Sequence, residues 1–553
     1  MQVAWTSGMR WIAAATLALT ALFAVGCTSG ATNQPAAGNQ TLVYVTSALP
    51  LGFDPCFTAG SPTAEIMTNL YASWTRYKVG NQSSGQLGDI TATGEQAMQS
   101  GLIESWKQSS DGLTYTLNLR QGLKDAYGNL ITADDALWSI QRISQVGGCS
   151  FVTANMGITK STNLATRLAQ VNQHVSVTGP NTLRVTLDGP APIFLRMFAV
   201  GNGSFVGPEA RKHATTDDPW ATTWLKTNAD ATGPYQLQSY TPGVEVVLTR
   251  NPNYYGPKPA IAKVIYKEVD SDATRTAILL GGQAQVARDL SQDELDQIGQ
   301  SKKAYTVCPI ANYMLNLTPN AVSGPTANSA VRRALAYAIP YESIIQSVYR
   351  NRATRQYGMA PSIYPDFLGQ SSYPYQTDLA QAKQMLAAAG FPSGFDATVV
   401  ISNTSPEQEA TAILLQNSFK QIGVNLSIDS EPFAKYTSIT QQHSFPNFAL
   451  WNINSLVIDY GYHASLFLNP GAPPNFNYGS WKQQEFDGLL SQVPSMAPTD
   501  RKAATQRMQE IFNQELPYIP IATIAQCTAF QKGVSGYVWH TTNQVFFADL
   551  KMG

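Results

Sequence analysis

The sequence predicts an α/β protein with more than one domain, and two observations support this. Segments with the alternating pattern of strands interleave along the chain with segments that have the pattern of helices, as is typical of α/β architectures. The chain has 553 residues, far more than one hydrophobic core usually serves, so at least two domains are expected. Apolar residues make up 44% of the chain and aromatic residues 10%, which indicates well-packed globular domains.

Local signals place the elements that interleave. Strands are predicted at 40–45, 115–120 and 182–187, where β-branched or aromatic residues alternate with polar ones. Helices are predicted at 134–146, 328–349 and 378–389. Thr132 is the expected cap of the first helix, Pro340 interrupts the second and Gly390 stops the third.

The charge content narrows the class of partner. Charged residues are only 13% of the chain, and 36 Lys and Arg stand against 37 Asp and Glu, for a net charge of −1. A nucleic-acid-binding protein needs a basic surface. We therefore expect no nucleic-acid partner.

The N-terminus has the organisation of a secretory signal. Arg10 precedes an almost uncharged run over 11–26. The apolar part of this run is shorter than the roughly 20 residues that cross a bilayer, so residues 1–26 are predicted to be a signal peptide rather than a membrane span. The polar, small-residue stretch that follows, residues 27–40, is predicted to be a flexible tether.

Cys27 gives this signal a possible second function. The segment Ala24-Val25-Gly26-Cys27 resembles the bacterial lipobox, although Ala24 stands where Leu is preferred. The resemblance implies that Cys27 carries lipid and that the chain is anchored to the outer face of the cell membrane. An ordinary signal peptide with a chance cysteine is the alternative.

Four cysteines remain, Cys56, Cys149, Cys308 and Cys527. An even number in an oxidising compartment suggests two disulfides, and four cysteines allow three pairings. Four buried free thiols are the alternative.

The sequence has no pattern typical of an enzyme or a metal site. Ser204 follows a glycine directly, so the segment around it lacks the Gly-x-Ser-x-Gly spacing of a nucleophile elbow. The five histidines are scattered, without a His-x-x-x-His or Cys-x-x-Cys pair. We expect no enzymatic activity, no metal and no cofactor.

Several segments, in order along the chain, resemble the family-5 solute-binding proteins of ABC importers, which include dipeptide- and oligopeptide-binding proteins. These segments are GLIESW (101–106), DGLTYTLNLRQG (111–122), GNLITADD (128–135), TGPY (232–235), RNPNYY (250–255), VRRALAYAI (331–339) and PYIP (517–520). The resemblance covers almost the whole chain after the tether.

The resemblance implies a two-lobed, periplasmic-binding-protein-like fold of the large cluster C type, with a hinge between the lobes. The expected boundaries are lobe I at 41–305 with an inserted subdomain at about 80–190, lobe II at 306–518, and a return to lobe I at 519–553. It also implies a monomer that captures short peptides by lobe closure. The partners would be ABC permease subunits in the membrane, with the ATPase on the far side.

Other functions stay open at this point. The same fold also serves proteins that bind oligosaccharides, nickel chelates or haem, and a fold does not determine the ligand. An extracellular peptide sensor that signals without transport is a further alternative.

The resemblance also points to ligand-binding residues. Peptide-binding members hold the peptide's α-amino group on the aspartate of a W-x-A-D-Y-x-D/E-P segment. Asp459 and Tyr460 match the core of that segment, although Trp451 lies farther upstream and the second acid and the proline are missing. An ammonium in a closed cleft needs a charged partner, which a carboxylate supplies. A plain loop carboxylate is the alternative.

The expected site has further members, which are Trp451, Asn454, Tyr460, Tyr462, Tyr313 and Ser61. The aromatic ones would wall the site and add cation–π contacts. Arg352 and Arg355 are candidates for binding a carboxylate at the ligand's far end, but solvated surface arginines are the favoured interpretation.

The resemblance finally implies how the cysteines pair. Cys308 and Cys527 lie in segments 305–317 and 519–530, which should form strands that run side by side between the lobes. Cys56 would then pair with Cys149 and pin an early loop to the end of the helix predicted at 134–146.

Overall fold

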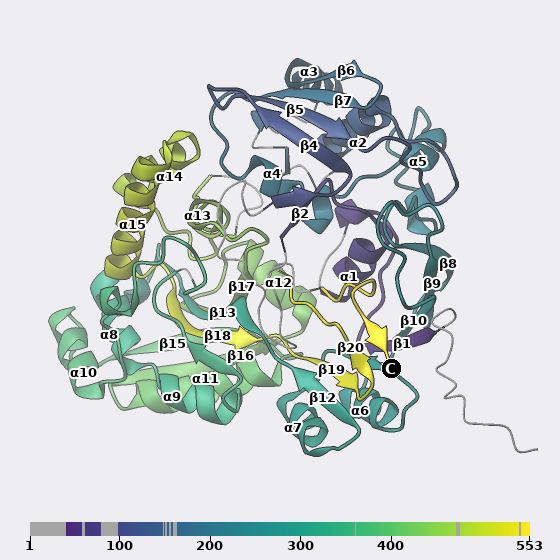
Figure 1. Ribbon diagram of the computed structural model, residues 1–553. Helices are drawn as coiled ribbons and strands as arrows, with labels where there is room; N and C mark the ends of the chain where they lie inside the picture. The colour runs from purple at the N-terminus through teal and green to yellow at the C-terminus, as the bar shows by residue number, and fades with distance from the viewer. Residues whose placement is uncertain are drawn as a thin grey trace, which may run out of the picture. The chain divides into compact units, whose positions relative to one another are not determined.

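The computed structural model describes residues 40–57, 61–78, 98–146, 149, 152–153, 156–158, 163–359, 361–471, 476–540 and 544–553 (Figure 1). The predicted signal peptide, most of the tether and Cys27 lie outside these residues, as do the side chains of 61–63 and 202. Within the described part of the chain, no helix combines the length and the apolar character that crossing a membrane requires.

The first lobe is built on a seven-stranded sheet with the order β12-β19-β11-β1-β10-β9-β8. Its strands are β1 (Thr41–Thr46), β8 (Tyr235–Thr241), β9 (Glu245–Arg250), β10 (Lys263–Glu268), β11 (Val286–Ala287), β12 (Ala304–Val307) and β19 (Thr528–Gln531). Its helices are α1 (Ser61–Leu70), α5 (Pro208–Lys212), α6 (Asp272–Leu280) and α7 (Gln292–Gln300). Tyr44 and Tyr266 face each other across β1 and β10 with ring centroids 4.3 Å apart, and this buried pair joins the two parallel strands.

A smaller unit, here called the insert, belongs to the first lobe and has its own core. Its sheet has the order β4-β5-β7-β6, from β4 (Ile103–Gln108), β5 (Thr114–Leu119), β6 (Val175–Gly179) and β7 (Thr182–Thr186). Its helices are α2 (Ala133–Gln145), α3 (Leu164–His174) and α4 (Phe194–Met197), and the short strands β2 (Thr75–Tyr77) and β3 (Met98–Ser100) pair beside it. The disulfide Cys56–Cys149 lies in the same core.

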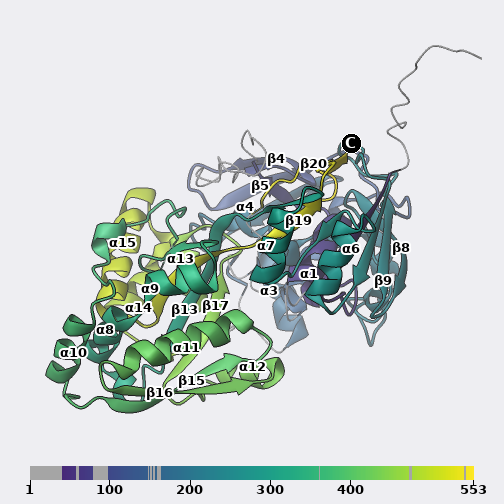
Figure 2. The same ribbon diagram turned by 90° about the horizontal axis from the view of Figure 1, so that it is seen from below.

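The second lobe is built on a six-stranded sheet with the order β14-β18-β13-β17-β15-β16. Its strands are β13 (Ile310–Pro319), β14 (Ala353–Arg355), β15 (Phe395–Ser402), β16 (Val424–Glu431), β17 (Phe448–Asn454) and β18 (Ile519–Ala525). Its helices are α8 (Ser329–Ala338), α9 (Tyr341–Ser343), α10 (Leu379–Ala388), α11 (Pro406–Lys420), α12 (Phe433–Gln441), α13 (Tyr460–Phe467), α14 (Gln484–Gln492) and α15 (Pro498–Glu515). Figure 2 shows α11 running alongside β15 and β16.

The chain passes between the two large sheets twice. It leaves the seven-stranded sheet at β12 and enters the six-stranded sheet at β13, and it returns from β18 to β19. The disulfide Cys308–Cys527 joins the two crossings, with Cα atoms 4.1 Å apart. We expected the return to begin at residue 519, but β18 pairs with β13 and β14, so the sheet pairings place the return at β19. The other expected boundaries stay predictions.

The local predictions match the structure closely. Thr132 caps α2, and its backbone N–H donates to the carboxylate of Asp135 at 3.0 Å. Pro340 separates α8 from α9, and Gly390 follows α10 with a φ of 96°, which glycine adopts without strain. Both predicted disulfides are confirmed.

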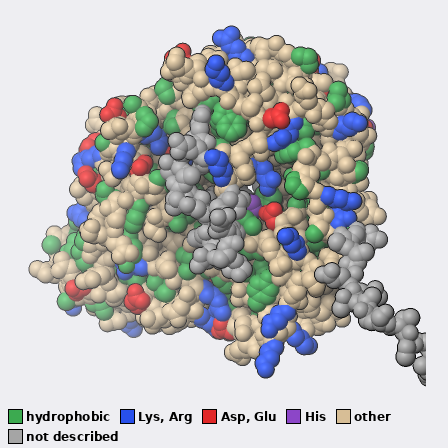
Figure 3. All heavy atoms as spheres, in the orientation of Figure 1, with side chains coloured by type: hydrophobic (Ala, Val, Ile, Leu, Met, Phe, Trp, Pro, Cys, Tyr) green, Lys and Arg blue, Asp and Glu red, His purple; other side chains and the backbone are tan. Residues whose placement is uncertain are grey.

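The surface agrees with the balanced charge of the sequence. On the face drawn in Figure 3, Lys and Arg side chains are interspersed with Asp and Glu and with polar side chains.

Candidate functional site

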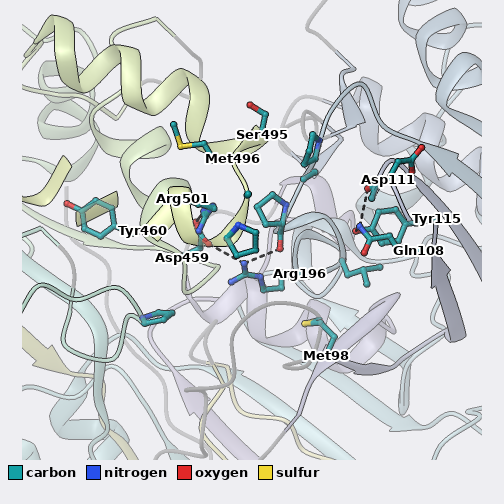
Figure 4. Close-up of a pocket in the computed structure, with 18 of the residues that line it drawn as sticks. Met98, Gln108, Asp111, Tyr115, Arg196, Asp459, Tyr460, Ser495, Met496 and Arg501 are labelled. Atoms are coloured by element: carbon teal, nitrogen blue, oxygen red, sulfur yellow. Dashed lines mark hydrogen bonds and ion pairs between the residues drawn. The ribbon is translucent and has the colours of Figure 1, made fainter. Parts of the chain in front are cut away.

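A cavity of about 770 Å³ lies between the insert and the second lobe (Figure 4). The insert side is lined by Met98, Gln108, Ser110, Asp111, Gly112, Tyr115, Pro190, Ala191, Pro192, Leu195 and Arg196. The second-lobe side is lined by Pro365, Asp366, Asp459, Tyr460, Ser495, Met496, Ala497, Pro498 and Arg501. A cavity of this size suits a small-molecule ligand, and its place between two lobes is where binding proteins of this architecture hold one.

Asp459 lies at this cavity because of how the chain turns from β17 into α13. It is the N-cap of α13, and its Oδ1 accepts a hydrogen bond from the backbone N–H of Tyr462 at 2.9 Å. The capping geometry holds the carboxylate at the start of the helix, where the helix dipole favours negative charge. Its side chain is only 4% exposed.

Two arginines from different parts of the chain reach this carboxylate. Arg501 of α15 donates from Nη2 to Oδ1 of Asp459 at 2.6 Å. Arg196 of α4 donates from Nη2 to Oδ2 at 3.2 Å and from Nη1 to the carbonyl oxygen of Ile458 at 3.1 Å. Figure 4 shows Arg196 and Arg501 converging on Asp459. The Arg196 contacts join the insert to the second lobe, whereas the Arg501 contact stays within the second lobe.

The electrostatics keep Asp459 ionised. Burial alone would raise the pKa of its carboxyl group, but the two guanidinium groups and the Tyr462 N–H hold that pKa below its usual range. A carboxylate offers about four acceptor positions. Among the described residues three N–H donors occupy it.

Gly461 is what allows Arg501 to approach. A Cβ atom at Gly461 would lie 2.6 Å from Cγ1 of Val493 and 2.9 Å from Nη2 of Arg501. Such distances are too short for real contacts, so any larger residue would push the guanidinium away from Asp459.

The predicted site residues divide into two groups. Asp459 and Tyr460 line the cavity, as Figure 4 shows. Tyr462 packs into the hydrophobic core of the insert instead. Ser61 begins α1, and its side chain lies outside the described residues.

The other predicted residues lie on neighbouring strands of the second lobe. Trp451 of β17 stacks on Tyr436, with ring centroids 5.0 Å apart. Tyr313 of β13 lies opposite Asn454, and its hydroxyl accepts a hydrogen bond from Nδ2 of Asn452 at 3.2 Å. None of Trp451, Tyr313 and Asn454 is among the described residues that line the cavity, and their part in binding stays a prediction.

Arg352 and Arg355 are engaged away from this cavity. Arg352 donates to Oδ1 of Asp296 on α7 at 2.5 Å, so it contacts the first lobe. The guanidinium of Arg355 lies over the ring of Tyr341, 3.1 Å from its centroid. Neither residue lines the cavity.

The sequence did not reveal Arg196, Arg501 or Asp366. Arg196 lies 263 positions from Asp459 and Arg501 lies 42 positions from it. No spacing rule connects such residues, and only the tertiary fold brings them together. Within the part of the chain that the structure describes, no three His, Cys, Asp or Glu side chains gather as metal ligands would.

The family comparison covers most of the chain. Residues 97–472 match the model of the bacterial extracellular solute-binding proteins, family 5. The glutathione-binding protein GsiB of Salmonella typhimurium is 25% identical over 463 residues, which are 81% of this chain and 86% of that protein. Heme-binding protein A of Haemophilus influenzae is 25% identical over 543 residues, 95% of each chain.

Solved structures show the same two-lobed fold. The periplasmic binding protein DppA from Helicobacter pylori, in complex with the peptide STSA, matches with a TM-score of 0.76 and 23% identity, over 93% of this chain and 98% of that one. A dipeptide-binding protein from Pseudoalteromonas sp. SM9913, in complex with Met-Leu, matches with a TM-score of 0.77 and 22% identity, over 93% of this chain and all of that one.

Proposed function

We propose, because the chain belongs to the bacterial extracellular solute-binding proteins of family 5, that it captures short peptides outside the cytoplasmic membrane and delivers them to an ABC permease. The observation that supports this most directly is the ionised carboxylate of Asp459 at the cavity between the lobes. The peptide complexes of two proteins with the same fold favour this ligand class. The protein would bind and release its ligand unchanged, without a resident cofactor.

The proposed recognition centres on the peptide's α-amino group. An ammonium that enters the cavity loses water and needs a charge-assisted hydrogen bond, which the carboxylate of Asp459 offers. Tyr460 is among the residues at the same cavity, but its side chain is only 1% exposed and packs into the main hydrophobic core, so it is not needed for the proposed recognition. Closure of the lobes would then bury most of the ligand's surface.

We also propose that Cys27 is lipidated and that the chain works as a monomer on the outer face of the membrane. The small-residue segment before Cys27 supports this. Metabolic labelling with a palmitate analogue should mark the wild type and leave Cys27→Ser unmarked. Equal labelling of both would contradict it.

Calorimetry across a four-way cycle tests the ligand proposal. Asp459→Asn keeps the shape of the side chain and removes its charge. Losing one partner of a desolvated charge pair costs about 2–5 kcal/mol, so peptide affinity should fall at least about thirtyfold. Acetylating the peptide's N-terminus should cost the wild type a similar factor and the variant little, because both changes delete one contact.

Asp366→Asn is the matched control, because Asp366 lines the same cavity without contacting the two arginines. It should leave the discrimination against acetylated peptides intact. If the wild type binds free and acetylated peptides equally well, the amine is not the anchor.

Native mass spectrometry of gently purified protein tests the alternatives. A co-purifying oligosaccharide, nickel chelate or haem would replace the peptide as ligand. Peptide uptake that persists in cells lacking the protein would instead favour a sensor that does not transport.

A further inference from the structure

The contact between Arg196 and Asp459 joins two parts of the molecule that open and close against each other. Arg196 belongs to α4 in the insert, and Asp459 begins α13 in the second lobe. Beside it, Val457 and Tyr462 of the second lobe are buried in the core of the insert. The insert and the second lobe are therefore in direct contact through side chains of the chain itself.

Arg196 holds the position that the proposed ligand needs. Its guanidinium donates to Oδ2 of Asp459, which is the oxygen without the helix-capping bond. A ligand ammonium that approaches Asp459 meets this oxygen as the less occupied one. A guanidinium and an ammonium are both cationic donors, so they compete for the same partner.

Arg196 has two further contacts, one on each side. Its Nη1 donates to the carbonyl oxygen of Ile458 in the second lobe at 3.1 Å, so this bond, like the one to Asp459, breaks when the lobes open. Its Nη2 also donates to the carbonyl oxygen of Pro192, 3.1 Å away within the insert, and this bond does not depend on closure. Its Nε is buried without a hydrogen-bond partner among the described residues. The Nε of Arg501 is likewise buried without one among the described residues, so both guanidinium groups carry a desolvation cost.

Arg501 is placed differently. Its contact with Asp459 is shorter, at 2.6 Å, and lies within the second lobe, where Gly461 makes room for it. Opening the lobes does not require this contact to break. Of the two arginines, Arg196 is thus the one that closure brings to Asp459.

We propose that Arg196 is an internal stand-in for the ligand's ammonium group, which closes the lobes on Asp459 when no ligand is bound and which the ligand displaces. The nature of the ligand rests on the proposed function, whereas the contact between Arg196 and Asp459 does not. The contact lowers the apparent affinity, since the ligand must replace one cation by another. It also selects for ligands whose cation makes a better partner than a guanidinium with an unpaired Nε.

The first experiment needs no ligand. Spin labels at Lys107→Cys in the insert and Lys502→Cys in the second lobe report the distance between the lobes, in protein stripped of ligand by unfolding and refolding with its disulfides intact. Arg196→Gln, which removes the charge, should shift the distance distribution to longer values. Arg196→Lys, which keeps the charge, should restore much of the short distance.

Two control variants sharpen this experiment. Arg501→Gln also deprives Asp459 of a guanidinium, but within one lobe, so it should leave the distance close to that of the wild type. Arg350→Gln removes an exposed contact between the lobes and should do the same. If Arg196→Gln leaves the distance unchanged, or if Arg501→Gln lengthens it equally, the proposal is overturned.

The second experiment measures affinity. The apparent affinity of the wild type is its full affinity multiplied by the fraction of molecules in which Arg196 does not occupy Asp459. Removing this competitor restores the full affinity, so Arg196→Gln should bind free-amine peptides about 5- to 50-fold more tightly. It should change the binding of N-acetylated peptides little. If Arg196→Gln weakens free-amine peptides as Asp459→Asn does, Arg196 is a ligand contact and not a competitor. If neither wild type nor variant binds any peptide, the proposed function fails, and the distance measurement still decides the role of Arg196.

Discussion

Among the described residues, ionic contacts join the lobes at two places, which differ in burial and in position. The Arg196–Asp459 pair is buried, with side chains 6% and 4% exposed. The second contact joins Arg350 and Arg352 of the second lobe to Asp293 and Asp296 on α7, and its side chains are 20–80% exposed. In the six-stranded sheet, β17 leads to Asp459 and lies beside β13. Strand β14, which follows Arg352, lies on the other side of the β18–β13 pair, beside β18. The two contacts thus flank the crossing strands.

The comparison teaches that the distance between two charged atoms does not by itself decide how much their contact contributes to stability. The exposed cluster has more partners, yet water and salt screen it, and exposed pairs contribute about 0–1 kcal/mol. At the buried site the charges have lost their water, so removing one partner leaves an uncompensated charge. We expect the function to depend on the buried contact and to be nearly indifferent to the exposed one.

The largest expected effect is that of Asp459→Asn on stability. This change leaves Arg196 and Arg501 buried without their carboxylate, which should lower the free energy of unfolding by about 3–5 kcal/mol. Urea denaturation of ligand-free protein measures it, with Asp296→Asn at the exposed contact as control. Equal losses in the two variants would contradict the comparison.

Asp459→Asn should also change how the free energy of unfolding depends on pH. Because the folded state holds the pKa of Asp459 below its unfolded value, its contribution is present above about pH 4 and is lost as the pH falls further. The free energy of unfolding should therefore fall less steeply below pH 4 in Asp459→Asn than in the wild type. Parallel profiles would show that other carboxyl groups dominate this range.

Removing the disulfide Cys308–Cys527, which lies between the two ionic contacts, should have the next largest effect on the free energy of unfolding. Cys308 and Cys527 are 219 positions apart, so their bond closes a long loop. The double variant Cys308→Ser/Cys527→Ser should lose about 2–4 kcal/mol of unfolding free energy. The spin-label distance should also broaden if the bond restrains the crossings. A variant as stable as the wild type would show that the two segments that cross between the lobes keep their arrangement without the disulfide.

Gly461→Ala should disturb the packing beside the buried contact. The added methyl group meets Val493 and Arg501 at less than 3.0 Å, so it should cost about 1–3 kcal/mol and loosen the Arg501 contact. Gly488→Ala in α14, where a Cβ meets no neighbouring atom within 4 Å, is the matched control and should be neutral or slightly stabilising. Equal effects of the two substitutions would refute the steric argument.

The smallest effect is expected at the exposed contact. Asp296→Asn removes a partner of both Arg350 and Arg352, yet it should change the free energy of unfolding by less than about 1 kcal/mol. That difference should vanish at about 1 M salt, where the Debye length is roughly 3 Å. A larger, salt-independent loss would show that this cluster behaves as a buried one.

Helix caps and short strands could be predicted from the sequence because they depend on residues that are close together in the chain. Thr132 and Asp135 cap α2 from within one turn, and Gly390 ends α10 because glycine alone tolerates its φ of 96° without strain. The strands at 41–46 and 114–119 follow from alternation along a few residues. The two-lobed fold and the disulfide pairing needed the family resemblance, because cysteines 93 and 219 positions apart carry no signal of their pairing.

By itself, the sequence determined where the chain turns into helix or strand, and its resemblance to the family pointed to the carboxylate of Asp459. Only the tertiary structure decided what surrounds that carboxylate. It placed Arg196 and Arg501 on the two oxygens, sent Tyr462 into the insert, and left Trp451 and Tyr313 on neighbouring strands. The physical reason is range: capping and turns depend on neighbours in the chain, whereas the partners of this buried carboxylate lie 42 and 263 positions away and are brought to it by tertiary packing.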